Sequence, residues 1–159
     1  MSALSSQVLR FQFLLKMVNV EAVKLNGTWQ RLFAEPFNQA RALQLKTDDL
    51  FAERVEAFVS RFCRLQDTLG DKLIPVLLDL LGERNKVMID NLDIAERLEL
   101  IPSADEWMAI RQLRNQMIHE YIEDLTILVN ALQAAQAYVP HLLVVVRKIN
   151  NEAKSRAWL

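Results

Sequence analysis

Apolar residues recur along most of the chain at intervals of three or four positions, and polar residues fill the positions between them. This spacing is typical of amphipathic helices, whereas a half-buried strand alternates at every second position. Gly and Pro, the residues that most often interrupt helices, number only three and four in 159 residues. The pattern therefore predicts an all-α protein.

Interruptions in this periodicity divide the chain into about five helices, with approximate ends. Thr47–Asp49 is a suitable start for the third helix, with a cap and acidic residues in its first turn, and Ser103–Glu106 has the sequence of a capping box at the start of the last one. The third helix contains two candidate breaks, near Gly70 and Pro75. The predicted helices cover about residues 4–25, 28–44, 48–81, 87–99 and 104–156.

The last predicted helix contains two further candidate breaks, near Tyr121–Asp124 and at Pro140. The run Leu142–Val146 is short, apolar and rich in valine, so in isolation it also fits a buried strand. Its neighbours on both sides are helical in character. We therefore predict a helix that passes through Pro140 with a kink.

The composition is that of one ordinary globular domain, expected to span residues 1–159. Hydrophobic residues make up 52%, charged residues 25%, and the net charge is -1. These values argue against disorder and against a protein that coats nucleic acid. The architecture expected is an antiparallel helical bundle of about five helices.

The single cysteine, Cys63, excludes an internal disulfide and any metal site made only of cysteines. No continuous apolar run approaches the roughly 20 residues that span a bilayer. The first residues lack the basic and apolar regions of a signal peptide. We therefore expect a cytoplasmic protein that does not contact a membrane.

Residues 104–125 form the most informative predicted helix. On a helical wheel, Arg114 and Tyr121 lie near the centre of the apolar arc, and Arg111, Asn115 and His119 lie along one flank. A charged guanidinium on an apolar face needs a partner. The apolar arc is formed by Trp107, Ile110, Leu113, Met117, Ile118 and Leu125.

Two interpretations of Arg114 remain open. It forms a buried ion pair with an acid such as Asp67 or Asp71, or extends its charged end to solvent. Alternatively, it lies at a concave subunit interface and binds a phosphate. The polar series Arg61, Arg64, Asp67, Asp71 and Lys72 is similarly open, because helical spacing allows either salt-bridged pairs or the lining of a cleft.

His119 is one of only two histidines, and its unperturbed pKa near 6.5 suits proton transfer at neutral pH. Asn115, four residues earlier, is able to orient the imidazole or a substrate; a purely structural histidine is the alternative. The five-residue interval separates Arg114 from His119 by about 140° on a regular helix. The two side chains converge if the long arginine side chain extends around the helix, if the helix bends, or if a second subunit completes the site.

An arginine five residues before a histidine is common by chance, but the addition of Tyr121, one of only two tyrosines, makes the combination rare. The segment Arg114–Tyr121 resembles the R-x4-H-x-Y signature of HEPN-superfamily toxins, especially HepT-like toxins paired with an MNT nucleotidyltransferase antitoxin. The resemblance extends over about residues 48–159. Phe62–Leu73 is similar to the family's second bundle helix, and Leu92–Leu100 to the segment before the motif helix.

The resemblance implies a homodimer in which two motif helices face each other across a cleft that cleaves RNA, such as tRNA or mRNA, without a metal or other cofactor. Arg114 would bind the scissile phosphate, His119 would act on the ribose 2′-hydroxyl or the leaving oxygen, and Asn115 would support them. Tyr121 matches the position at which the antitoxin attaches AMP, taken from ATP. Cys63 is less polar than expected at its position in the second helix.

Two other functional classes fit the same residues. In one, the chain is a non-catalytic subunit that presents RNA or a nucleotide to a nucleotidyltransferase. In the other, it is a helical interaction protein in which Arg114 belongs to a structural ion pair. The helical wheel favours the first two classes over the third, and it does not separate the ribonuclease from the binding subunit.

Overall fold

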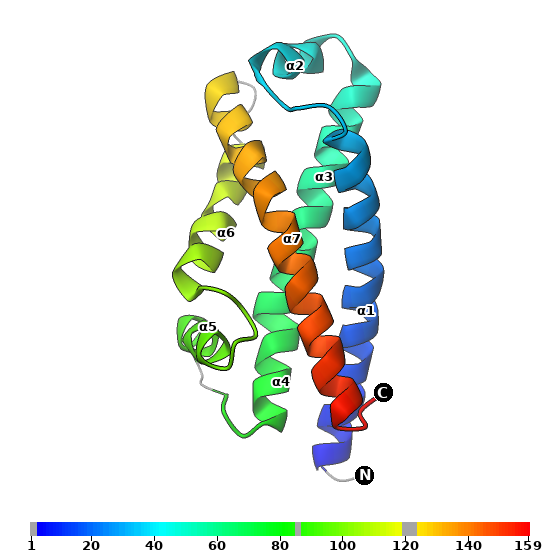
Figure 1. The fold of residues 1–159 in the computed structure, drawn as a ribbon, viewed down its shortest axis with the longest axis vertical. Coiled ribbons are helices and arrows are strands. Elements are labelled where there is room, and N and C mark those ends of the chain that lie inside the picture. The colour runs from blue at the N-terminus through cyan, green and yellow to red at the C-terminus, as the bar shows by residue number, and fades with distance from the viewer. Residues whose placement is uncertain (1–2, 85–86, 119–123) are drawn as a thin grey trace.

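The computed structural model describes residues 3–84, 87–118 and 124–159, and all regular structure in these ranges is helical. Figure 1 shows an elongated bundle whose helices run mainly along its long axis. This confirms the prediction of an all-α bundle. The elements are α1 (Ala3–Leu32), α2 (Gln39–Leu43), the 3₁₀ turn η1 (Gln44–Lys46), α3 (Asp49–Asp67), the π-helical segment η2 (Thr68–Leu73), α4 (Ile74–Leu80), α5 (Met88–Arg97), α6 (Ala104–Ile118) and α7 (Leu125–Ser155).

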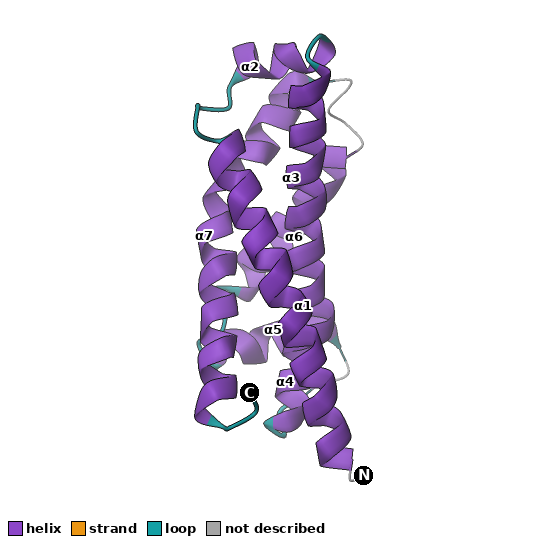
Figure 2. Ribbon diagram, turned by 90° about the vertical axis from the view of Figure 1, so that its right-hand side faces the viewer, coloured by secondary structure: helices purple, strands orange, loops and turns teal. Residues whose placement is uncertain are grey.

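Three long rods form the centre of the bundle. They are α1, the continuous series α3–η2–α4, and α7, and α1 packs against both of the others. The shorter α5 and α6 lie beside this centre, with α6 in contact with α3 and α7 (Figures 1 and 2). The short α2 lies at one end of the bundle and contacts α7. This arrangement places α6, the helix with Arg114, alongside α3.

The first helix is longer than predicted, because α1 continues through Gly27 to Leu32. Leu25, Thr28 and Leu32 are all buried, so core packing on both sides of the glycine maintains the helix. The prediction of one helix over residues 28–44 was wrong. A loop separates α1 from α2, and Arg41 Nη1 donates to the carbonyl of Leu32 at 2.6 Å, which satisfies the end of α1.

The third predicted helix is continuous through both candidate breaks, but it changes to π-helical geometry over Thr68–Leu73. Pro75 lies in the first turn of α4. The helix starts predicted at Thr47–Asp49 and at Ser103 are both capped, since Asp48 Oδ1 accepts from the amide of Phe51 at 3.0 Å and Ser103 Oγ from that of Glu106 at 3.1 Å.

The last predicted helix is divided, as one of the two candidate breaks anticipated. The helix α6 ends at Ile118, and α7 begins at Leu125 with Asp124 Oδ1 accepting from the amide of Thr126 at 2.9 Å. Pro140 does not end α7, and the run Leu142–Val146 is helical, so the strand alternative is excluded.

The core is formed mainly by leucine, valine and aromatic side chains from α1, α3, α4 and α7. Trp107 is the largest fully buried side chain, and it attaches α6 to this core. The helix α7 is the one described helix that is long and apolar enough to cross a membrane, with a mean hydropathy of 1.3 in its most apolar window. Half of that window is buried in the bundle, and core helices of soluble proteins share this property.

Candidate functional site

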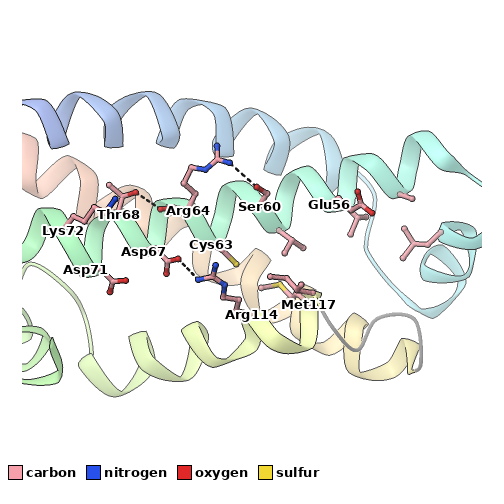
Figure 3. Close-up of a pocket in the computed structure, with 15 residues that line it drawn as sticks. Glu56, Ser60, Cys63, Arg64, Asp67, Thr68, Asp71, Lys72, Arg114 and Met117 are labelled. Atoms are coloured by element: carbon pink, nitrogen blue, oxygen red, sulfur yellow. Dashed lines mark hydrogen bonds and ion pairs between the residues drawn. The ribbon is translucent and has the colours of Figure 1, made fainter.

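Arg114 faces α3 and forms an ion pair with Asp67. The distance from its Nη1 to Asp67 Oδ2 is 2.5 Å, and the two side chains are 44% and 30% exposed. Asp67 is one of the two acids that the ion-pair interpretation named as a partner. The pair is not buried, however, because both side chains keep part of their surface in solvent. Figure 3 shows Arg114 on α6 pointing toward Asp67 on α3.

Arg111 extends this ion pair into a network of four charges. Its Nη2 lies 3.1 Å from Asp71 Oδ2, and its Nε lies 3.8 Å from Asp67 Oδ1. Asp67 therefore contacts both arginines of α6, and the charges alternate in the order Asp71, Arg111, Asp67, Arg114. This network fixes the position of the Arg114 guanidinium relative to α3.

Beside these charges, α6 packs closely against the π-helical segment η2 at Gly70. A Cβ atom on Gly70 would lie 3.0 Å from Nε1 of Trp107, so the indole packs directly against a backbone that has no side chain there. One residue before Asp67, Gln66 Nε2 donates to the carbonyl of Trp107 at 3.0 Å. Single-turn π segments occur frequently at functional sites.

Three ionisable groups in or beside the network have pKa values above their usual ones. Burial raises the pKa of the Asp71 carboxyl, although the charge of Arg111 opposes this shift. The hydrogen bond to Asp67 raises the pKa of Arg114, so its positive charge is retained. Burial also raises the pKa of the Cys63 thiol to about 11. At neutral pH this cysteine is a protonated, weakly nucleophilic group beside the Arg114–Asp67 pair.

A groove of about 800 Å³ opens between the α3–η2 rod and the end of α6 (Figure 3). We call it the α3–α6 groove. Ligand pockets for small molecules commonly have volumes of about 300–1,000 Å³. Its apolar part is formed by Leu45, Ala52, Val55, Val59, Cys63, Met117 and Ile118. Its polar part is formed by Glu56, Ser60, Arg64, Asp67, Thr68, Asp71, Lys72 and Arg114.

The groove brings together several residues that the sequence singled out. Of the polar series, Arg64, Asp67, Asp71 and Lys72 line the groove, whereas Arg61 lies outside it and donates a hydrogen bond to Thr28 Oγ1. Asp67 and Asp71 form ion pairs, but their partners lie on α6 and not within the series. Asn115 is exposed and does not line the groove. His119 and Tyr121 lie outside the described residues. The last described residue before them, Ile118, lines the groove and is 41% exposed, although the wheel predicted it on the buried face.

Sequence reasoning missed two features of this site. It placed Arg111 on the flank of the motif helix without assigning it a partner, although Asp67 and Asp71, four residues apart, face the pair Arg111 and Arg114, three residues apart. It also gave no indication of the apolar half of the groove. That half combines residues from segments far apart in the sequence, such as Leu45 and Met117.

Among the described residues, no group of three or more histidine, cysteine or carboxylate side chains is arranged to hold a metal ion. The site consists of a positioned arginine, its acidic partners and a groove with one apolar and one charged half.

Comparison of the chain with protein-family models, with curated proteins and with solved structures gave no match.

Proposed function

We propose that the protein is a metal-independent endoribonuclease toxin, active in the cytoplasm as a homodimer and inhibited by an MNT-type nucleotidyltransferase antitoxin. The observation that best supports this function is the half-exposed Arg114, held by Asp67 at the groove, five residues before His119. The sequence combination Arg114–His119–Tyr121 supplies the chemical groups, and the groove supplies space for a ribose and its phosphate.

In this proposal Arg114 binds the scissile phosphate. A guanidinium has five N–H donors in a planar fork. Asp67 accepts a hydrogen bond from Nη1, and at the exposed edge the remaining N–H groups, which donate to none of the described residues, meet the phosphate oxygens. Asp67 therefore positions the cation and leaves it able to stabilise negative charge on phosphorus.

RNA carries its own nucleophile, so the reaction needs a base, an acid and a cation. The neutral His119 of one subunit removes the proton from the ribose 2′-hydroxyl as the oxygen attacks phosphorus. The protonated His119 of the other subunit donates to the 5′-oxygen as its bond to phosphorus breaks. The products are a 2′,3′-cyclic phosphate and a free 5′-hydroxyl, and Asn115 supports the two groups.

Inhibition acts through Tyr121 in the proposal. The phenolic oxygen attacks the α-phosphorus of ATP on the antitoxin, pyrophosphate leaves, and the phenolic proton passes to solvent. The attached AMP places a negative phosphate close to Arg114 in sequence, where it competes with the phosphate of RNA. Intact-mass analysis after co-expression with the antitoxin should show added AMP that disappears in Tyr121→Phe; unchanged additions in that variant would contradict this step.

The role of Arg114 is tested with a matched pair of variants. Arg84 forms an ion pair with Asp79 at 2.6 Å, and its side chain is 47% exposed, close to the 44% of Arg114, but it lies outside the groove. Arg114→Ala should reduce the rate of RNA cleavage in EDTA by about 100-fold or more, whereas Arg84→Ala should leave it within about twofold. Equal rates for the two variants would contradict the proposed contact with phosphate.

A non-catalytic RNA- or nucleotide-binding subunit is the second candidate. It is favoured by Arg114 itself, because a guanidinium that is 44% exposed at the groove can bind a phosphate whether or not the phosphodiester is cleaved. The same assays separate the two candidates. Binding of RNA that depends on Arg114, with no cleavage by unmodified wild-type protein, would establish the binding subunit and exclude the ribonuclease.

A further inference from the structure

The outer face of α1 carries an apolar stripe that no other described element covers. Leu9, Phe13, Val20 and Val23 are 51%, 60%, 52% and 73% exposed. The opposite face of the same helix contributes Phe11, Leu14, Leu15, Val18, Ala22 and Leu25 to the core. Figure 2 shows α1 on the side nearest the viewer. A helix that is apolar on two opposite faces is normally buried on both.

The spacing of this stripe is that of a helix-packing seam. Leu9, Phe13, Lys16, Val20 and Val23 follow one another at intervals of four, three, four and three residues. This is the alternation of the a and d positions in a heptad repeat, which pack against a second helix. We call these five residues the α1 seam. The groove beside it, about 700 Å³ in volume, runs between α1 and Leu159 and is also lined by Gln12 and Asn19.

The charged side chains of α1 in and beside the α1 seam are all positive. Lys16 lies in the middle of the seam, and Arg10 and Lys24 immediately follow Leu9 and Val23, at the flanking positions that set partner choice in coiled coils. None of these three cations forms an ion pair with a described residue. The one acid of α1, Glu21, is turned inward, where it accepts a hydrogen bond from Thr68 Oγ1 at 3.3 Å.

From the heptad spacing and this uncompensated positive charge, we infer that the α1 seam binds an acidic amphipathic helix of another protein. The apolar positions of that helix pack on Leu9, Phe13, Val20 and Val23, and its carboxylates pair with Arg10, Lys16 and Lys24. Recognition of this kind is a standard mode of peptide binding. This inference does not rest on the proposed ribonuclease activity.

Two other occupants fit the surface less well. A second copy of α1 packed about a two-fold axis would bring the two Lys16 side chains together, because Lys16 is at the centre of the seam, and like charges opposed in an interface are unfavourable. A lipid bilayer would place the Lys16 ammonium in the middle of the apolar contact, and burial of an unpaired charge is costly. The carboxylates of an acidic helix remove both penalties.

The test uses two synthetic helical peptides of about four heptads with leucine at a and d. One has glutamate at the flanking e and g positions, and the other has lysine there. Isothermal titration with the full-length protein should show binding of the acidic peptide at least about tenfold tighter than that of the basic one. Equal affinity for the two peptides, or binding of neither, would overturn the inference.

Two variants locate the contact. Val20→Glu should weaken binding of the acidic peptide by about tenfold or more, while Leu43→Glu on α2, at an exposed position (53%, against 52% for Val20), should not. The double variant Lys16→Glu/Lys24→Glu should reverse the preference to the basic peptide. Circular dichroism verifies that all variants are folded. An unchanged preference in the double variant would overturn the inference.

The competing occupants are tested on the same samples. Co-sedimentation with vesicles of phosphatidylcholine and phosphatidylserine, and sedimentation velocity of the protein alone, should show no change between wild type and Val20→Glu. Vesicle binding lost in Val20→Glu would assign the seam to a membrane. Self-association lost in the same variant would assign it to a second copy, and either result would overturn the inference.

Discussion

The Arg114–Asp67 pair is defined by its partial exposure. Both side chains reach solvent, so water screens their attraction and the pair contributes little to stability. In a fully buried pair the cation would have no access to a ligand, so such a pair would have a structural role alone. Partial exposure instead leaves Arg114 oriented and accessible, which are the two properties that a phosphate-binding group needs.

Substitution of Asp67 should therefore have a small energetic cost. Asp67→Asn is expected to lower the free energy of unfolding by less than about 1 kcal/mol, because exposed ion pairs typically contribute about 0.2–1 kcal/mol. Urea denaturation measures this, with Asp79→Asn as the control that breaks the Arg84–Asp79 pair of similar exposure. A loss of several kcal/mol for Asp67→Asn alone would show that the network is a buried structural element.

Cys63 should be unreactive in the folded protein because its raised pKa of about 11 leaves only about one thiol in a thousand ionised at pH 8. Alkylation by iodoacetamide at pH 8 should be about 100-fold slower than in urea, and the rate should rise about tenfold per pH unit up to pH 10. In the unfolded chain the thiol loses its proton at a lower pH than in the folded protein, so ionisation favours the unfolded chain. The free energy of unfolding therefore falls as the pH rises from about 9 to about 11. Rapid alkylation of folded protein at pH 8 would contradict the burial.

At the scale of elements, the contact between η2 and α6 determines where the site residues lie. The π-helical turn contains Gly70, and Trp107 packs against it, with Asp67 and Asp71 on either side of the glycine in sequence. A change in this contact shifts α3 relative to α6 and alters the distances within the ion-pair network. The geometry of the site thus depends on one glycine.

Gly70→Ala should destabilise the protein by about 1–3 kcal/mol, the usual cost of overpacking. The added Cβ would meet Trp107 Nε1 at 3.0 Å and Cζ2 at 3.3 Å, on a buried ring that has little room to move. Gly27→Ala is the matched control, because its Cβ meets only the flexible end of Arg31, at 3.2 Å. That change should be neutral or stabilise the helix by up to about 1 kcal/mol. A Gly70→Ala variant as stable as wild type in urea would contradict the close contact.

The elements that the sequence predicted well are those whose signals are local. Asp48 and Ser103 are caps that act within three residues, and the helical periodicity of α3 and α6 is equally local. The extension of α1 through Gly27 was missed because tertiary packing of Thr28 and Leu32 outweighs the weak helix propensity of glycine. The π segment was missed for a similar reason, since it depends on contact with a tryptophan far away in the sequence.

The same distinction applies to the site. Asp67 was one of two candidate partners of Arg114, because Asp67 and Asp71 lie at helical spacing on the predicted third helix. The sequence left burial and exposure of Arg114 as alternatives, because a helical wheel gives a direction and not the depth of the neighbouring surface. The apolar part of the groove combines residues from η1, α3 and α6, and only the packed bundle brings them together.

For the molecule as a whole, the proposal requires a dimer, because one His119 accepts a proton while another donates one. We expect a stable dimer at micromolar concentration, measured by light scattering. If the dimer covers the α3–α6 groove, Ile118→Glu should shift it towards monomer, while Leu98→Glu, at a side chain with the same 41% exposure on a different surface, should not. A wild-type monomer at micromolar concentration would contradict a site shared between subunits.

The most direct test of the account is the cleavage of total RNA and bulk tRNA by purified, unmodified protein in EDTA, compared with His119→Ala. The account predicts products that end in a 2′,3′-cyclic phosphate, and a loss of at least about 100-fold in rate when the imidazole is removed. Cleavage at the same rate by His119→Ala, or no cleavage by the wild type, would contradict the assignment of the protein as a metal-independent ribonuclease.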